Sequence, residues 1–141
     1  MLKVIQLTKY ERRVFMKFDI CVPILGFENV KQVTLEKIDD VFMKMQSVDD
    51  KYISFTLINP FVLREYDFEV PDNTQELLGI DKDSNIIVQN IVLIQTPIED
   101  SVINFIGPMI FNTNNNKAAQ VILSETTKYG VAEKISTFLK K

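Results

Sequence analysis

The sequence predicts a mostly β, single-domain, β-barrel-like fold of short antiparallel strands, with a short helix near residues 72–78 and a C-terminal helix. Three observations predict it. Apolar and polar residues alternate over many short segments, turn residues separate those segments, and helical spacing is rare. The 141 residues fit one domain. A closed barrel hides strand edges that could otherwise pair with other chains, and a two-sheet sandwich is the alternative.

The first strands are predicted by a period of two in the apolar residues, which is the pattern of a half-buried strand. This pattern covers residues 16–22, 33–35, 41–45, 52–58 and 66–70. Pro23 and Gly26 mark a turn after the first segment. Asn59-Pro60 ends the fourth, because proline has no ladder donor.

A short helix is predicted from Asp72 to Leu78, where Pro71 closes the preceding strand. Asp72 is expected to cap it, with Gln75 in position for the reciprocal capping contact. Gly79 suits the left-handed residue that ends many helices.

The second half begins with the most apolar segment, residues 86–96, which predicts a long central strand. Two strand pieces, 102–106 and 109–111, are expected to bend at Gly107-Pro108. An asparagine-rich turn and a strand over 118–123 follow. Val131, Ile135 and Leu139 then have helical spacing, and Lys140-Lys141 suit the negative end of a helix over this segment.

Residues 1–15 form an N-terminal extension before the domain proper, residues 16–141. They carry four basic residues and one acidic residue, so the rest of the chain has 12 basic and 18 acidic residues and a net charge near −6. The extension is either disordered, an artefact of an upstream start codon, or an additional strand through Val4, Ile5 and Leu7. Without it, partner binding should persist. The acidic domain repels phosphate backbones and favours a basic protein partner.

Several kinds of site are disfavoured by the composition. The chain has no histidine, which is the usual general base and zinc ligand. Its four glycines are too dispersed for a phosphate-binding loop. The segment from Asp81 starts like a calcium loop, but Ile86 and Val92 replace the required glycine and glutamate. We therefore expect no enzyme activity, no cofactor and no metal.

The expected compartment is the cytoplasm. The single cysteine, Cys21, forms no internal disulfide, which agrees with a reducing environment. No apolar run approaches the roughly 20 residues of a membrane span. Charged residues at positions 9 and 11–13 stand where a signal peptide would be apolar.

Four segments resemble the flagellar assembly factor FliW family: VPILGFE (22–28), SFTLINPFVLREYDFEVPD (54–72), IVLIQTPIEDSVINFIGPMIFN (91–112) and AQVIL (119–123). The resemblance spans Met16 to the C-terminus. It implies a small β-barrel-type cytoplasmic protein that binds flagellin and also CsrA, a small basic RNA-binding protein that represses flagellin translation. By exchanging these partners the protein relieves that repression. An export chaperone for flagellin, without a translational role, is the alternative.

The resemblance also suggests which residues bind partners, because its distinctive blocks fall at loops and strand ends. These candidates are Asn59, Pro60, Phe61, Arg64, Glu65 and Tyr66 at one corner, and Glu99, Asp100 and Asn104 at an acidic turn. Core packing is the alternative role for Phe61 and Tyr66, and turn geometry for Pro60. Arg64, the only arginine after Met16, either pairs with a carboxylate or lies free on the surface. Whether flagellin and CsrA share one surface stays open.

Overall fold

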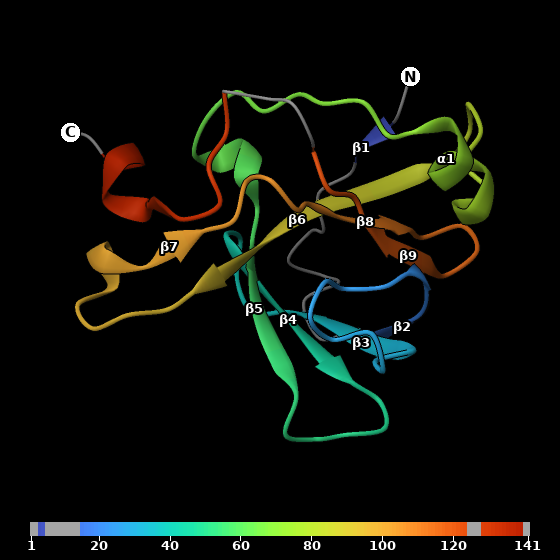
Figure 1. The fold of residues 1–141 in the computed structure, drawn as a ribbon, viewed down its shortest axis with the longest axis horizontal. Helices are drawn as coiled ribbons and strands as arrows, with labels where there is room; N and C mark the ends of the chain where they lie inside the picture. Colours follow the sequence, from blue (N-terminus) through green and yellow to red (C-terminus); the bar gives the residue numbers. More distant parts are fainter. Residues whose placement is uncertain (1–2, 5–14, 124–127, 140–141) are drawn as a thin grey trace.

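Ten strands and one short α-helix form the described part of the chain, residues 3–4, 15–123 and 128–139, in a computed structural model (Figure 1). The strands are β1 (Lys3–Val4), β2 (Phe15–Val22), β3 (Gln32–Lys37), β4 (Phe42–Ser47), β5 (Ser54–Ile58), β6 (Asn85–Leu93), β7 (Val102–Ile103), β8 (Met109–Asn112), β9 (Lys117–Gln120) and β10 (Glu133–Lys134). The helix α1 spans Asp72–Leu78, and three short 3-10 helices are η2 (Pro60–Val62), η3 (Ile98–Asp100) and η4 (Ile135–Phe138).

Seven of these strands close into a barrel, which confirms the predicted fold class. Neighbouring strands pair in the order β6, β5, β4, β3, β2, β9, β8, and β8 returns to pair with β6. Every pairing around the ring is antiparallel except that between β2 and β9. Closure removes the free edges that an open sheet would expose.

The barrel interior is filled by alternate residues of its strands, as the period-two patterns predicted. In β3 and β4 the buried positions alternate with half-buried or exposed ones. At the centre, the rings of Phe18 and Phe111 meet edge to face, with centroids 5.1 Å apart. Burying each large apolar side chain contributes about 1.5–3 kcal/mol. The other interior residues include Val33, Leu35, Met45, Leu57, Ile87 and Met109.

A second apolar cluster lies on the outer face of β6 and its neighbours. Ile86, Val88 and Val92 alternate with the inward-facing Ile87, so β6 is buried on both faces. This double burial explains its nearly continuous apolar sequence. The segments that cover the outer face are the chain after β5, α1, β7 and residues 128–138, which supply Tyr66, Val70, Leu78, Ile103, Phe105, Tyr129 and Ile135.

The predicted C-terminal helix is wrong. Residues 133–134 form β10, which pairs antiparallel with β7, and only the single turn η4 follows. Of the three residues with helical spacing, Ile135 is buried, whereas Val131 is 66% and Leu139 is 49% exposed. The segment lacks the continuous buried face that stabilises a surface helix, and its backbone pairs with β7 instead.

In two places after β5 the structure also differs from the local structure that the sequence predicted. Residues 66–70 keep the predicted alternation of burial, but they run extended without forming a strand. Helix α1 has its predicted bounds, yet Asp72 does not cap it, because Pro71 is the N-cap and no side chain caps this end. Gly79 does end it in the left-handed conformation, with φ 65°.

Of the N-terminal extension, residues 1–15, the structure describes β1 and Phe15, the first residue of β2. Strand β1 pairs in parallel with the start of β6, Val4 opposite Ile86. Ile5 and Leu7, the other residues of the expected extra strand, lie outside the described residues. The division at residues 15 and 16 stays a prediction. Within the described ranges, no helix is long and apolar enough to cross a membrane.

Candidate partner-binding site

The corner after β5 is built by Asn59 and Pro60. The Asn59 side chain accepts a hydrogen bond from the Phe61 backbone N–H at 2.9 Å and so caps η2. Proline suits the first helical position, where its missing N–H costs nothing. Asn59 and Pro60 are buried, whereas Phe61 and Val62 reach the surface. The corner therefore presents two apolar side chains at the end of a barrel strand.

Tyr66 anchors the chain that follows the corner to the outer face of the barrel. Its hydroxyl donates to the Phe105 carbonyl at 2.6 Å and accepts from Nδ2 of Asn90 at 3.1 Å. Asn90 also donates to the Asn104 carbonyl at 2.9 Å, so it joins Tyr66 to Asn104. Burial raises the pKa of Tyr66 far above its ordinary value. The hydroxyl is thus a neutral, permanent donor.

Arg64 fastens the C-terminal segment to the corner. Its Nη1 lies 3.1 Å from Oε1 of Glu133, and both side chains are only 24% exposed. The guanidinium carbon also lies 4.8–5.3 Å from three ring centroids, those of Phe105, Tyr129 and Phe138. A flat guanidinium can stack on aromatic rings while its edge pairs with a carboxylate.

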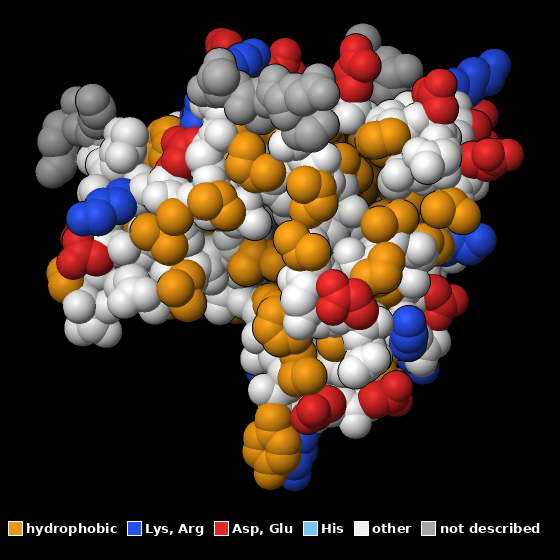
Figure 2. Space-filling view, viewed as in Figure 1, with side chains coloured by type: hydrophobic (Ala, Val, Ile, Leu, Met, Phe, Trp, Pro, Cys, Tyr) orange, Lys and Arg blue, Asp and Glu red, His pale blue; other side chains and the backbone are white. Residues whose placement is uncertain are grey.

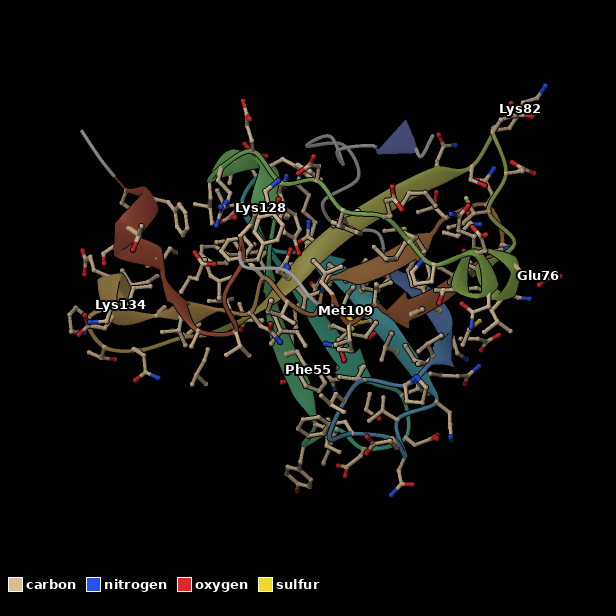
Figure 3. All side chains as sticks on the ribbon, turned by 45° about the horizontal axis from the view of Figure 1, so that its top comes forward. Phe55, Glu76, Lys82, Met109, Lys128 and Lys134 are labelled. Carbon is tan, nitrogen blue, oxygen red and sulfur yellow. The ribbon has the colours of Figure 1, made fainter. Side chains whose placement is uncertain are left out.

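Strand β10 extends this connection to the acidic turn. Glu133 pairs with Arg64, and the next residue, Lys134, lies 3.8 Å from Asp100 in η3. Figure 3 places Lys134 at the end of the molecule formed by β7 and η4. Glu99 and Asp100 are exposed there. The corner and the acidic turn, 33 or more residues apart in sequence, are therefore linked through two neighbouring residues of β10.

A polar cluster around Tyr129 lines a groove beside the corner. Its hydroxyl lies 3.0 Å from Oδ1 of Asp67, and Nζ of Lys128 lies 3.4 Å from the same oxygen (Figure 3). The Tyr129 hydrogen bond, followed by Lys128, lowers the pKa of Asp67. A groove of about 600 Å³ runs here, lined by Arg64, Glu65, Tyr66, Asp67, Lys128 and Tyr129.

The nine predicted residues divide by exposure. Phe61, Glu65, Glu99 and Asp100 are exposed, and Arg64 is partly so. Asn59, Pro60 and Tyr66 are buried. Asn104 is half-buried, and its side chain accepts the backbone N–H groups of Ile106 and Gly107 at 2.9 and 3.1 Å.

Sequence reasoning missed Asn90, Tyr129 and Glu133, which connect the predicted residues. Asn90 had a visible signal, since it is a polar break inside the most apolar segment. Glu133 had no such signal in the sequence, because the apolar spacing of its segment predicted a helix. The two alternatives left open for Arg64 are resolved, since it pairs with a carboxylate.

The side chains of this region form a surface with apolar, acidic and aromatic parts. In the ranges that the structure describes, no group of three or more histidine, cysteine, aspartate or glutamate side chains could hold a metal ion. The turn from Asp81, which begins like a calcium loop, is held by its own hydrogen bonds, with Asp81 accepting from the Asp83 N–H at 2.9 Å.

Comparisons with known proteins agree on one family. Residues 5–135 match the FliW protein family. The flagellar assembly factor FliW of Sulfurimonas denitrificans is 76% identical over 126 residues, which cover 89% of this chain and 100% of that protein. Flagellar assembly factor FliW 2 of Wolinella succinogenes is 47% identical, covering 87% and 92%. A crystal structure of the flagellar assembly factor FliW is similar with a TM-score of 0.80 and 27% identity, covering 97% of this chain and 92% of that one.

Proposed function

This chain belongs to the FliW family of flagellar assembly factors, and from that premise we propose that it binds flagellin and CsrA in turn, in the cytoplasm, and so relieves the repression of flagellin translation by CsrA. When flagellin accumulates, it occupies the protein and leaves CsrA free to repress. When flagellin is exported, the released protein captures CsrA. This exchange follows from mass action between partners and needs no catalysis and no cofactor.

The observation that carries the proposal is the joining of the corner and the acidic turn through β10. Through the ion pairs Arg64–Glu133 and Lys134–Asp100, neighbouring residues of β10 contact both predicted sites, and these contacts support the proposal. The domain after Met16 is acidic, with 12 basic and 18 acidic residues. An acidic module that docks beside a basic RNA-binding surface adds repulsion against phosphate, which supports release of RNA.

The nine candidate residues have two roles in this proposal. The exposed residues Glu65, Glu99 and Asp100 attract the basic partner, and Phe61 supplies an apolar anchor at the corner. The buried or half-buried residues position them. These are Asn59, Pro60, Arg64, Tyr66 and Asn104.

An export chaperone for flagellin, without a translational role, is the competing function. It predicts binding to flagellin alone. The acidic balance of the domain favours capture of a basic partner as well, and so favours the exchange.

The test is titration calorimetry of the full chain with purified CsrA and with purified flagellin, followed by competition. We expect binding to both and mutual displacement. Glu99→Lys combined with Asp100→Lys should weaken CsrA binding at least tenfold, and more at low salt, because it reverses two exposed charges.

The matched control is Glu76→Lys combined with Asp83→Lys, which reverses two exposed charges, one in α1 and one in the turn before β6. Figure 3 shows Glu76 on the opposite side of the molecule from Lys134. It should leave CsrA binding unchanged. If the protein binds flagellin but not CsrA, the partner exchange is refuted and the chaperone function is supported. Binding of neither partner would refute both.

A further inference from the structure

Two turns at one end of the barrel carry large apolar side chains that the core does not use. They are residues 23–31, between β2 and β3, and residues 48–53, between β4 and β5. Tyr52 is 86% and Leu25 is 70% exposed, and Phe27 and Val48 are also exposed. We call these four residues the turn-end surface. Figure 2 shows apolar side chains gathered along this face down to the tip of the β4–β5 hairpin.

The two turns are joined through the strands beside them. The ring of Phe27 in the first turn meets that of Phe55 in β5 edge to face, with centroids 4.9 Å apart. The Val48 backbone N–H in the second turn donates to the carbonyl of Gln32 at the start of β3, at 2.9 Å. In Figure 1 this end lies apart from β7 and η4, where the acidic turn is found.

The first turn is held in a fixed shape before any partner arrives. The Leu25 N–H donates to Oε1 of Gln120 at 2.7 Å, and the Gly26 N–H donates to Oε2 of Glu28 at 2.9 Å. Gly26 has φ 88°, a conformation that favours glycine. A surface that is already rigid loses less entropy when it binds.

Hairpin turns do not need this exposure to fold, as two hairpin turns at the opposite end of the barrel show. The turn between β3 and β4 there has a single exposed large apolar residue, Ile38. The turn between β8 and β9 consists of Thr113 and three asparagines. Single exposed apolar residues are normal on proteins, but four on two neighbouring turns, two of them aromatic, are typical of an interaction site.

The charges around the turn-end surface indicate what it binds. Three carboxylates, Glu28, Asp49 and Asp50, stand on the two turns against two lysines, Lys31 and Lys51. The backbone N–H of Gly26 lowers the pKa of Glu28 and keeps it ionised. The ammonium of Lys51 lies 5.5 Å from the centre of the Tyr52 ring, where it faces this chain's own aromatic side chain. Acidic groups beside an apolar centre complement a basic, amphipathic segment.

We propose that the turn-end surface is a second docking site, which takes an amphipathic helix of a protein partner with lysine or arginine beside its apolar face. Leu25, Phe27 and Tyr52 contact the apolar face, and Glu28 and Asp49 face the basic residues. This surface is separate from the corner and the acidic turn, so two partners can be held at once.

The test uses two synthetic helices and the full isotope-labelled chain. Both helices carry leucines at positions i, i+3, i+4 and i+7, and the leucines are flanked by lysines in one and by glutamates in the other. In NMR titrations the lysine-flanked helix should bind more tightly and shift the amide signals of residues 23–31 and 48–55. Tyr52→Ser should weaken binding of the lysine-flanked helix at least tenfold. Asp49→Lys should also weaken binding of that helix, and it should strengthen binding of the glutamate-flanked helix.

The matched control is Ile38→Ser, which removes an exposed apolar side chain at the other end of the barrel. It should leave both affinities unchanged. Equal affinity for the two helices, shifts elsewhere on the barrel, or no binding would overturn the proposal. Self-association of the wild-type chain that Tyr52→Ser abolishes would also overturn it, because the occupant would then be a second copy. None of these results depends on flagellin or CsrA.

Discussion

Arg64 and Glu133 are 69 residues apart in the sequence, yet Nη1 of the arginine lies 3.1 Å from Oε1 of the glutamate. Three aromatic rings surround the same guanidinium. The pair adds to the other attachments of the C-terminal segment, which are β10, the hydrogen bonds between Tyr129 and Asp67, and the ion pair of Lys134 with Asp100. It joins this segment directly to the corner.

Arg64→Ala should lower the free energy of unfolding by about 2 kcal/mol, because it removes a partly buried ion pair and three ring contacts. Urea unfolding measures the change. Arg64→Lys should recover part of it, since an ammonium keeps the charge but loses the planar stacking. A double-mutant cycle with Glu133→Gln should give a coupling of about 1 kcal/mol. Zero coupling would mean that the two side chains do not interact in solution.

Tyr66→Phe should destabilise the protein by about 1–2 kcal/mol although the ring remains, because the Phe105 carbonyl loses the donor and one N–H of the Asn90 amide loses the acceptor that the hydroxyl supplies. Thermal and urea unfolding test this. Tyr52→Phe is the control, since it removes the hydroxyl of a highly exposed tyrosine. Equal stability of Tyr66→Phe and the wild type would contradict the assigned hydrogen bonds.

Asp67 should make stability depend on acid pH. Its pKa is lowered in the folded protein, chiefly by the Tyr129 hydroxyl and then by Lys128. The stabilisation is therefore complete above the unfolded pKa of about 3.9 and is lost as the pH falls through the folded value. In NMR titration of the carboxyl carbon, Tyr129→Phe should raise this pKa toward its ordinary value. An unchanged pKa in that variant would rule out the hydroxyl as the main cause.

Gly26→Ala should cost about 1 kcal/mol, because residue 26 has positive φ and an L side chain is strained there. A Cβ would meet no atom within 4 Å, so the cost arises from the backbone alone. Gly26→Asn should cost less, since asparagine tolerates this conformation. Gly107→Ala provides a contrast, because its Cβ would come within 2.7 Å of the Gln120 amide. Equal stability of Gly26→Ala and Gly26→Asn would argue against backbone strain.

The sequence by itself determined the strands of the barrel interior and the short helix. Val33 and Leu35 alternate with polar residues because a strand turns successive side chains to opposite faces, and one face of β3 is buried. Gly79 marked the end of α1 because few other residues adopt its backbone conformation. These signals are local, so they can be read without knowing what packs against them.

The end of β5 at the corner was also predictable, because proline has no ladder donor and holds the residue before it extended. The exposed candidates Phe61, Glu65, Glu99 and Asp100 were identified from their blocks in the sequence. Their roles in binding stay predictions. What the sequence could not indicate was that these blocks lie near each other.

Only the tertiary structure decided how the barrel closes and where the C-terminal segment goes. The parallel pairing of β2 with β9 joins residues about 100 positions apart, such as Asp19 and Lys117, and no local pattern records such a contact. Residues 131–139 had the spacing of a helix, but the edge of β7 offered backbone hydrogen bonds and Arg64 offered a partner for Glu133. Helical spacing shows which residues could share a face, whereas the surrounding structure determines whether anything buries that face.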